Sequence, residues 1–331
     1  MKIMVTGGTG FIGSHIVDAL ERSFPPSNIS LIVRDLTKAN MRSKAGLSIF
    51  QGDITNPNSL NYAMNDFHPN VIIHVAALAD DWAPLSRLME VNAQGTQNVI
   101  DAMVQSNSAH FIIHISSSGV YPRKTSIHLT EDTPYGPYGN YHKSKVVAEK
   151  IVKDAIEKKL IDATIIRPPN VMGIRDFTHM AKMCQVIKKG KFPMIRNGQA
   201  LQTWVAATDL ARAVILVINQ QDKAIGQIYN IKSFEITVKE LYDQIATKLN
   251  VLEPPKNYPY FLAYIVGFIS EIIGKIKHKP STLNRYRIIK FGKNRLFDDS
   301  KIHSELGYHP ETSAEETITA TVEWLLKEGI V

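Results

Sequence analysis

The chain has 331 residues, a formal net charge of +7, 44% hydrophobic residues and 21% charged residues. These proportions exclude a largely disordered chain, because they supply enough apolar surface for a core. Most lysines alternate with acids on helical faces, so we expect no nucleic-acid partner. The single cysteine, Cys184, excludes an intrachain disulfide. A glycine-rich turn follows Met1 too closely for a secretory signal, so we expect a cytoplasmic protein.

Short apolar runs rich in β-branched residues alternate with helical patterns along the first two thirds of the chain. Strands are expected at residues 2–6, 29–33, 47–50, 71–75, 111–116, 164–167 and 227–231. Helices are expected at residues 11–22, 83–105, 141–159 and 208–219. Strands with continuous hydrophobicity are covered on both faces, as in a parallel sheet. The pattern predicts an α/β fold with a Rossmann-type doubly wound sheet, whose ligands bind at the carboxyl ends of the strands.

The chain is expected to divide into two units. A dinucleotide-binding Rossmann domain is predicted for residues 1–170 and 203–232. A smaller, mainly helical substrate-binding lobe is predicted for residues 171–202 and 233–331, where the strand pattern fades. The helices expected at 83–105 and 141–159 carry more apolar side chains than one sheet face covers, which favours a homodimer. The residues concerned are Val146, Val147, Ile151 and Val152.

Three glycines, Gly7, Gly10 and Gly13, stand at three-residue spacing between the first strand and the first helix. In this arrangement the first glycine permits the tight turn, the second lets the backbone approach a pyrophosphate, and the third lets helix and strand pack closely. Phe11 and Ile12 open the helix, whose first N–H groups and positive dipole end attract phosphates. The motif predicts a dinucleotide site.

The ends of the second and third strands carry the next candidate cofactor contacts. Arg34 occupies the tip of the second strand, where an arginine accommodates the 2′-phosphate of NADP and an acid holds the ribose of NAD. NADP is therefore favoured, and NAD is the alternative if Asp35 turns in to hold the ribose. Asp53 and Ile54 follow the third strand and are expected at the adenine edge.

Seven motifs, taken in order, resemble the extended short-chain dehydrogenase/reductase superfamily, also called the NAD-dependent epimerase/dehydratase family. They lie at residues 6–13, 52–54, 74–77, 91–99, 116–121, 141–145 and 167–173. The resemblance covers essentially the whole chain. It implies further cofactor contacts at Ala76, Ala77 and Pro168. It also implies that Asn92, counted with them, braces the backbone of the active site.

Tyr141 and Lys145 lie four residues apart at the start of a predicted helix, so their side chains share one face. A free phenol has a pKa near 10, and a neighbouring ammonium group favours the phenolate. Ser117 ends a strand beside this helix, and the family pattern selects it over Ser116 and Ser118. The resemblance implies a Ser-Tyr-Lys catalytic trio in which the tyrosine and the lysine also contact the cofactor.

No metal site is expected. His110 and His114 bracket a buried strand without a carboxylate or cysteine partner, so they are interpreted as core histidines. Cys184 lies in a helical pattern and is interpreted as a packing residue rather than a nucleophile.

The neighbours of the trio bear on the reaction. Dehydratases of this family place an Asp-Glu pair after the catalytic hydroxyl, and Ser118 and Gly119 stand there instead. The residues Asp80, Asp81 and Trp82 resemble a loop of the 3β-hydroxysteroid dehydrogenase-like branch. That branch implies hydride transfer to or from a hydrophobic ketone or alcohol of sterol, flavonol or β-keto-acid type. The alternatives are an NAD-dependent nucleotide-sugar 4-epimerase and a non-catalytic dinucleotide-binding sensor, which typically lacks the tyrosine or the lysine.

Residues 258–274 form an apolar helix candidate that precedes a run rich in lysine and arginine, residues 275–295. A membrane span needs about 20 apolar residues, so this segment is too short to cross a bilayer. The favoured interpretation is a helix that walls an apolar substrate pocket. In the alternative, the helix lies in a membrane interface, and the basic run meets anionic headgroups in a peripheral contact. The side chains that would then enter the membrane are Phe261, Leu262, Ile265 and Phe268.

Overall fold

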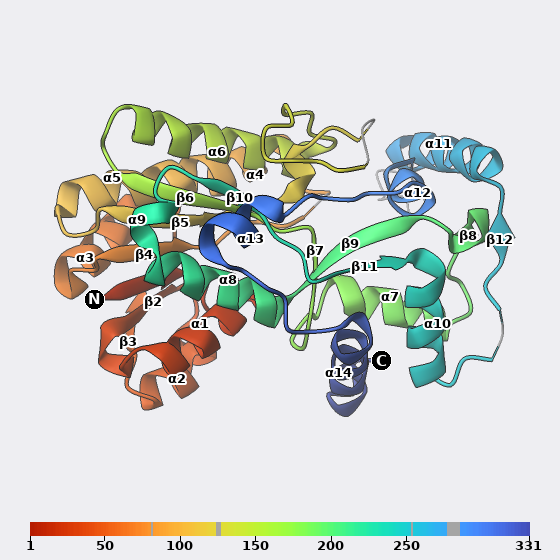
Figure 1. Ribbon diagram of the computed structural model, residues 1–331, viewed down its shortest axis with the longest axis horizontal. Coiled ribbons are helices and arrows are strands. Elements are labelled where there is room, and N and C mark those ends of the chain that lie inside the picture. Colours follow the sequence, from red (N-terminus) through yellow and green to blue (C-terminus); the bar gives the residue numbers. More distant parts are fainter. Residues whose placement is uncertain (81, 124–126, 253, 277–284) are drawn as a thin grey trace.

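The computed structural model describes residues 1–80, 82–123, 127–252, 254–276 and 285–331 (Figure 1). Its centre is a seven-stranded sheet in the order β10-β6-β5-β4-β1-β2-β3. All pairs in this sheet are parallel. The strands are β1 (Ile3–Thr6), β2 (Ile29–Val33), β3 (Ser48–Gln51), β4 (Val71–His74), β5 (Phe111–Ile115), β6 (Asp162–Arg167) and β10 (Ile228–Asn230). The predicted doubly wound sheet is confirmed.

Helices cover both faces of the sheet, which is why its strands are continuously apolar. Figure 1 shows α5 and α6 above the sheet and α1 and α8 below it. The helices of this part are α1 (Phe11–Ser23), α2 (Asn40–Lys44), α3 (Pro57–Phe67), α4 (Leu85–Leu88), α5 (Gly95–Ser106), α6 (Asn140–Glu157), α8 (Ala207–Asn219) and α9 (Gln221–Ala224). A π-helical segment, Met89–Gln94, joins α4 to α5.

A second region lies beyond the carboxyl ends of the strands (Figure 1). It contains a sheet of order β11-β9-β7, which the sequence did not predict, and the short pair β12-β8. Its strands are β7 (Asn170–Met172), β8 (Met194–Ile195), β9 (Leu201–Ala206), β11 (Phe234–Thr237) and β12 (Asn257–Tyr258). The helices of this region are α7 (His179–Lys188), α10 (Val238–Lys248), α11 (Tyr260–Ile276), α12 (Arg285–Gly292) and α14 (Ala314–Lys327). Helix α13 (Ser300–Leu306) instead contacts β10 and α9 of the first part.

This region has an apolar core of its own, to which β9, α7, α10 and α14 contribute. Trp204 on β9 is fully buried in it. The exact domain limits stay a prediction, as does the homodimer. Val146 and Val152 are buried inside the subunit, so any dimer face on α6 has to use other side chains, such as the half-buried Val147 and Ile151.

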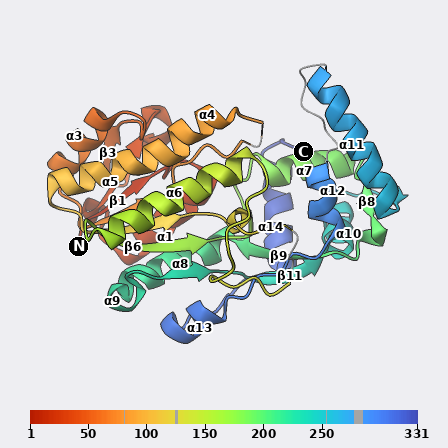
Figure 2. The ribbon, with the colours of Figure 1, turned by 90° about the horizontal axis from the view of Figure 1, so that it is seen from above.

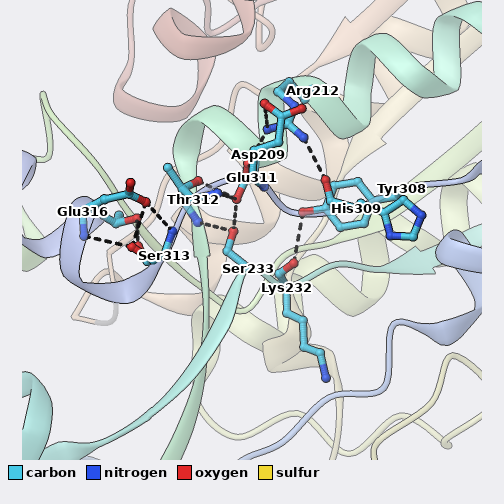
Figure 3. Close-up of polar contacts among 12 residues, drawn as sticks. Asp209, Arg212, Lys232, Ser233, Tyr308, His309, Glu311, Thr312, Ser313 and Glu316 are labelled. Atoms are coloured by element: carbon cyan, nitrogen blue, oxygen red, sulfur yellow. Dashed lines mark hydrogen bonds and ion pairs between the residues drawn. The ribbon is translucent and has the colours of Figure 1, made fainter.

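Asp209, in the first turn of α8, fastens the end of the chain to the Rossmann sheet (Figure 3). Its buried carboxylate accepts hydrogen bonds from Arg212 Nη1 (2.9 Å), Ser233 Oγ (2.6 Å), Glu311 N (3.2 Å), and Thr312 N (3.4 Å) and Oγ1 (2.6 Å). A buried carboxylate is tolerated only when hydrogen bonds replace its hydration. The segment that leads into α14 is thereby held against α8 and the loop before β11.

Replacing Asp209 with alanine should lower the free energy of unfolding by about 3–5 kcal/mol, because it leaves several part-buried donors without their acceptor. Urea denaturation measures this loss. Asp243→Ala is the matched control, since Asp243 pairs with an exposed lysine on α10. That change should cost less than about 1 kcal/mol. Equal losses in the two variants would contradict the role given to Asp209.

Candidate active site

The predicted site residues meet at one edge of the large sheet. Because its strands are parallel, their carboxyl ends lie together. Six predicted positions come within two residues of a strand end: Gly7, Arg34, Asp53, Ala76, Ser117 and Pro168. The strand order reverses between β1 and β4, which is where doubly wound sheets open a crevice for ligands.

The glycine turn between β1 and α1 depends on glycine at two positions. Gly7 has a φ of +76°, and a Cβ there would lie 2.7 Å from Ala76 N. A Cβ on Gly13 would lie 2.1 Å from Gly7 O. Gly10 differs, since a Cβ there would meet only Gly7 O, at 3.3 Å. The turn is closed on its inner side and open at Gly10.

The start of α1 suits a phosphate group. Gly10 is its N-cap residue and offers no side-chain cap, and the first turn contains no acid. The first N–H groups, beginning with Phe11 and Ile12, therefore keep their donors for a ligand. With the open side of Gly10, these donors fit the pyrophosphate of a dinucleotide.

A buried hydrogen-bond chain that sequence reasoning missed connects β1, β4 and the π-helical segment. Thr6 Oγ1 lies 2.7 Å from His74 Nδ1, His74 Nε2 lies 3.0 Å from Thr96 Oγ1, and Thr96 Oγ1 donates to Asn92 O (2.7 Å). Because the Thr96 hydroxyl donates its proton to Asn92 O, it can only accept from His74. These hydrogen bonds therefore assign the His74 proton to Nε2. Burial lowers the pKa of His74 to about 3, which keeps the ring neutral. The chain fixes Thr6, whose Oγ1 accepts from Ala76 N (3.3 Å).

Asn92 lies within the π-helical segment and is buried. Its Oδ1 accepts from Leu78 N (2.7 Å), and its Nδ2 donates to Leu78 O (3.1 Å) and to Ser144 Oγ (2.8 Å). The amide thus holds the backbone that follows Ala76 and Ala77 and ties it to α6. The wide turn of the π-helix accompanies the inward placement of this side chain, as π-bulges often do at functional sites.

Helix α6 brings Tyr141 and Lys145 to the end of β5. Lys145 Nζ is buried and donates to Ile115 O (2.7 Å), two residues before Ser117. Ser117 is half-buried, and its Oγ accepts from Gly119 N (3.0 Å). Tyr141 is also half-buried, one turn before Lys145. Burial lowers the pKa of Lys145 to about 8, although the charge of Glu149 acts in the opposite direction.

A buried ion pair holds the loop that carries Ser117. Arg167 Nη2 lies 2.7 Å from Glu149 Oε2, and both side chains are almost completely buried. Ser116 Oγ donates to Glu149 Oε1, and Tyr135 OH donates to Glu149 Oε2 (2.8 Å). Arg167 Nη1 donates to Tyr121 OH (2.8 Å) at the other end of the loop. Burial raises the pKa of Tyr121 to about 12, so its hydroxyl keeps its proton.

Arg295 also holds this loop. Its guanidinium donates to the carbonyl oxygens of Pro122 (3.0 Å), Ser118 (3.1 Å) and Tyr121 (3.4 Å). Ser118 N in turn donates to Pro168 O (2.9 Å) at the end of β6. In the sequence, Arg295 appeared only as the last residue of the basic run, and nothing indicated that it would bind this loop.

The position after Ser118 has no room for a side chain. A Cβ on Gly119 would lie 1.7 Å from His142 Cδ2 and 2.1 Å from His142 Nε2. His142 is buried, and its Nδ1 lies 2.7 Å from Tyr138 O, so the ring is fixed. The acidic residue that a dehydratase places at this position would not fit.

The candidate contacts for the adenosine half lie at the ends of β2 and β3. Arg34 is exposed, whereas the Asp35 carboxylate accepts from Thr37 N (3.0 Å) and Thr37 Oγ1 (2.6 Å). The Asp53 carboxylate accepts hydrogen bonds from the backbone N–H and the hydroxyl of Thr55. Ile54 is buried, and a Cβ on the helical Gly95 would lie 2.7 Å from its Cδ1.

The structure corrects one of the two histidine interpretations. His110 directly precedes β5, but its side chain is exposed, so it is not a core residue. His114 is buried, as expected, but neither of its ring nitrogens has a hydrogen-bond partner among the described residues. Cys184 is completely buried in α7, and burial raises the pKa of its thiol to about 12, which agrees with a packing role.

The sequence profile of the NAD dependent epimerase/dehydratase family matches residues 3–231, which contain the glycine turn, the Ser117 loop and the start of α6. The chain belongs to this family. Enzymes of the family depend on NAD and are of the extended short-chain dehydrogenase/reductase type, as the sequence motifs indicated.

Two curated relatives in the family match nearly the whole chain. One is the N-acetyl-alpha-D-glucosaminyl-diphospho-ditrans,octacis-undecaprenol 4-epimerase of Escherichia coli O157:H7, 27% identical over 95% of this chain and 92% of its own. Another is the decarboxylating sterol-4-alpha-carboxylate 3-dehydrogenase of Saccharomyces cerevisiae, 26% identical over 99% of each chain. Among solved structures, UDP-glucose 4-epimerase of Thermotoga maritima superposes with a TM-score of 0.79 over 99% of both chains at 20% identity, which shows the shared fold.

Buried Lys145 should give this family member a specific pH dependence of stability. Its pKa is about 8 in the folded chain and about 10.5 when unfolded, so the unfolded state holds more protons between these values. The cost of burying the charged lysine is therefore present below pH 8 and disappears as the pH rises to about 10.5. Relative to Lys145→Met, wild-type stability should rise across this window by up to about 3 kcal/mol.

Urea denaturation at a series of pH values measures this difference. Lys150→Met removes an exposed lysine from the same helix and corrects for the general loss of one charge. A difference between wild type and Lys145→Met that stays constant from pH 7 to pH 10 would contradict the assignment.

Proposed function

We propose that this enzyme transfers a hydride between a nicotinamide cofactor and a hydrophobic secondary alcohol or ketone, with Ser117, Tyr141 and Lys145 as its catalytic residues. The observation that carries the proposal is the meeting of α6 and β5: the Lys145 ammonium, one turn after Tyr141, is anchored on Ile115 O just before Ser117. Side chains of these types at this sheet edge supply a proton-transfer group, a charge beside it and a hydroxyl that orients the substrate.

In the oxidative direction, Tyr141 Oη takes the proton of the substrate hydroxyl. The Lys145 ammonium favours the phenolate that performs this step, and Ser117 Oγ holds the substrate oxygen by a hydrogen bond. Reduction runs the same proton transfer in reverse. NAD or NADP, when bound at the glycine turn and the start of α1, accepts or supplies the hydride. Asn92 and the loop contacts of Arg295 position this machinery without touching the reacting atoms.

Elimination of water does not fit this site. It would need an acid and a base next to the substrate, and the lack of space at Gly119 leaves no place for the acid of a family dehydratase. Dehydrogenation and epimerisation remain, since both begin with removal of a hydride. A sensor without catalysis is disfavoured because both Tyr141 and Lys145 are present.

The substrate class rests on the relatives. One acts on a sterol acid and one on a sugar attached to undecaprenyl diphosphate, according to their names. Both substrates carry a large apolar part, which supports a hydrophobic substrate here. The first relative also favours a second candidate function, 4-epimerisation of a lipid-linked sugar. Net reduction of NAD during turnover would favour the dehydrogenase, and recycling of bound NAD would favour the epimerase.

Tyr141→Phe removes only the hydroxyl that transfers the proton, so kcat should fall by about 10²–10⁴-fold while cofactor affinity is retained. Activity is measured with a panel of steroid ketones, flavonoid ketones and long-chain β-keto acids. Tyr138→Phe, three residues earlier and partly exposed, is the control and should remain within about ten-fold of wild type. Retention of most activity by Tyr141→Phe would refute the mechanism.

For the cofactor, we propose a preference for NADP within this NAD-dependent family. Arg34 is exposed at the tip of β2, and Asp35 is occupied by Thr37, which supports a phosphate partner at this position. Arg34→Asp should weaken NADP relative to NAD by roughly 10–100-fold, the worth of one or two charge-assisted hydrogen bonds. Arg22→Asp makes the same charge change on an exposed part of α1. Tighter binding of NAD than of NADP by the wild type would rule out the preference.

A further inference from the structure

Helix α11 lies at the outer edge of the molecule (Figure 2), and it exposes an apolar surface. Nine of its large apolar side chains are exposed: Phe261, Leu262, Ile265, Val266, Phe268, Ile269, Ile272, Ile273 and Ile276. The exposed fractions reach 71% for Phe261 and 73% for Ile276, at opposite ends of the helix. We call these nine side chains the α11 face. Isolated exposed apolar residues are ordinary, but a contiguous surface of this kind marks an interaction site.

The amphipathicity of α11 is inverted: its apolar side faces outward, and its small and polar side packs against the protein. At about 100° per residue, the nine exposed side chains fall within an arc of roughly 160°. The opposite side carries small or polar residues, among them Ala263, Gly267, Ser270 and Glu271. This inner side packs against Ile195 of β8 and Ile288 of α12. The expectation that the helix walls an apolar pocket is wrong for the α11 face, because an enclosing pocket would leave these side chains buried.

The segment that contains α11 is rich in positive charge. Residues 254–297 contain nine lysines and arginines and one acid, Glu271. Arg285 Nη2 lies 2.7 Å from Glu271 Oε2, which neutralises that acid. At the N-terminal end of the helix, exposed Lys293 lies 5.6 Å above the ring of Tyr260. Burial raises the pKa of Tyr260, and the positive charge of Arg196 acts in the opposite direction. Lys277 and Lys279 of the basic run lie outside the described residues.

We propose that α11 lies flat on an anionic lipid bilayer, with its apolar face in the interface and the flanking cations at the headgroups. An inverted amphipathic helix with lysine and arginine beside it has the composition of interfacial helices. Tyr260 and Tyr264, whose rings stack 6.1 Å apart, suit the boundary between the apolar and aqueous phases. None of the described helices is a candidate membrane span.

A second copy of the chain is a poorer occupant. In a two-fold dimer the same patch faces itself, so the flanking cations of both copies would be brought together. That repulsion grows as salt is removed, whereas attraction to anionic lipid grows under the same conditions. The sign of the salt effect therefore separates the two occupants.

The test is flotation of the full chain with vesicles at about 50 mM and about 500 mM salt. One set contains phosphatidylcholine only, and the other contains about one third phosphatidylglycerol. We expect flotation with the anionic vesicles at low salt, a decrease of at least about ten-fold at high salt, and little binding to neutral vesicles. No flotation with anionic vesicles at low salt, or equal flotation with both lipids, would overturn the proposal.

The double variant Phe261→Ser/Ile269→Ser should lose vesicle binding by at least about ten-fold. Its control, Leu160→Ser/Leu252→Ser, changes two exposed leucines outside α11 and should bind like the wild type. Circular dichroism and thermal unfolding verify that both variants are folded. Loss in both variants, or in neither, would refute the role of the α11 face. A dimer by sedimentation that Phe261→Ser/Ile269→Ser dissociates, without wild-type vesicle binding, would assign the face to a second copy instead.

Discussion

The ion pair between Glu149 and Arg167 is the constraint on which the rest of the site depends. It joins the middle of α6 to the end of β6, and its free oxygens and N–H groups reach Ser116, Tyr121 and Tyr135. The two ends of the Ser117 loop are therefore fixed by one buried pair. Desolvating two charges is costly, and removal of one partner from such a pair typically costs about 3–5 kcal/mol. Its full set of hydrogen bonds makes the pair tolerable and gives the loop a single conformation.

The same region places a third charge in the interior, and its energetics are opposite. Lys145 donates a hydrogen bond to the carbonyl of Ile115 (2.7 Å), and burial lowers its pKa to about 8. Glu149, one turn further along α6, partly compensates for this burial. Burying the Lys145 ammonium group one turn after Tyr141 lowers the stability of the fold. The Glu149 carboxylate, which also fixes the loop, offsets part of this loss. In the proposed mechanism, Glu149 thus acts on both the charge of Lys145 and the conformation of the Ser117 loop, so substitution of Glu149 would change both.

The sequence was sufficient to predict the large sheet and the positions at its carboxyl edge. Continuous apolar runs specify strands covered on both faces, and parallel strands bring residues such as Gly7 and Ser117 to one edge whatever the details. Contacts between distant segments leave no local signal in the sequence. The sequence therefore did not predict the hydrogen bonds from Arg295 to the Ser117 loop, nor the sheet of β7, β9 and β11. His74 was hidden for the same reason, since its partners come from two other elements. For α11 the periodicity revealed two faces but not which one packs inward, because that depends on α12 and β8.

Gly119 and His142 also bear on how this site can change during evolution. A Cβ at 119 would overlap the ring of His142, which is itself held by the backbone of Tyr138. A mutation that introduces an acid at 119 would therefore be harmful unless position 142 had already become smaller. The order of substitutions matters, and the intermediate has to survive without the histidine. An acid at position 119 therefore requires two substitutions in a set order, first at 142 and then at 119.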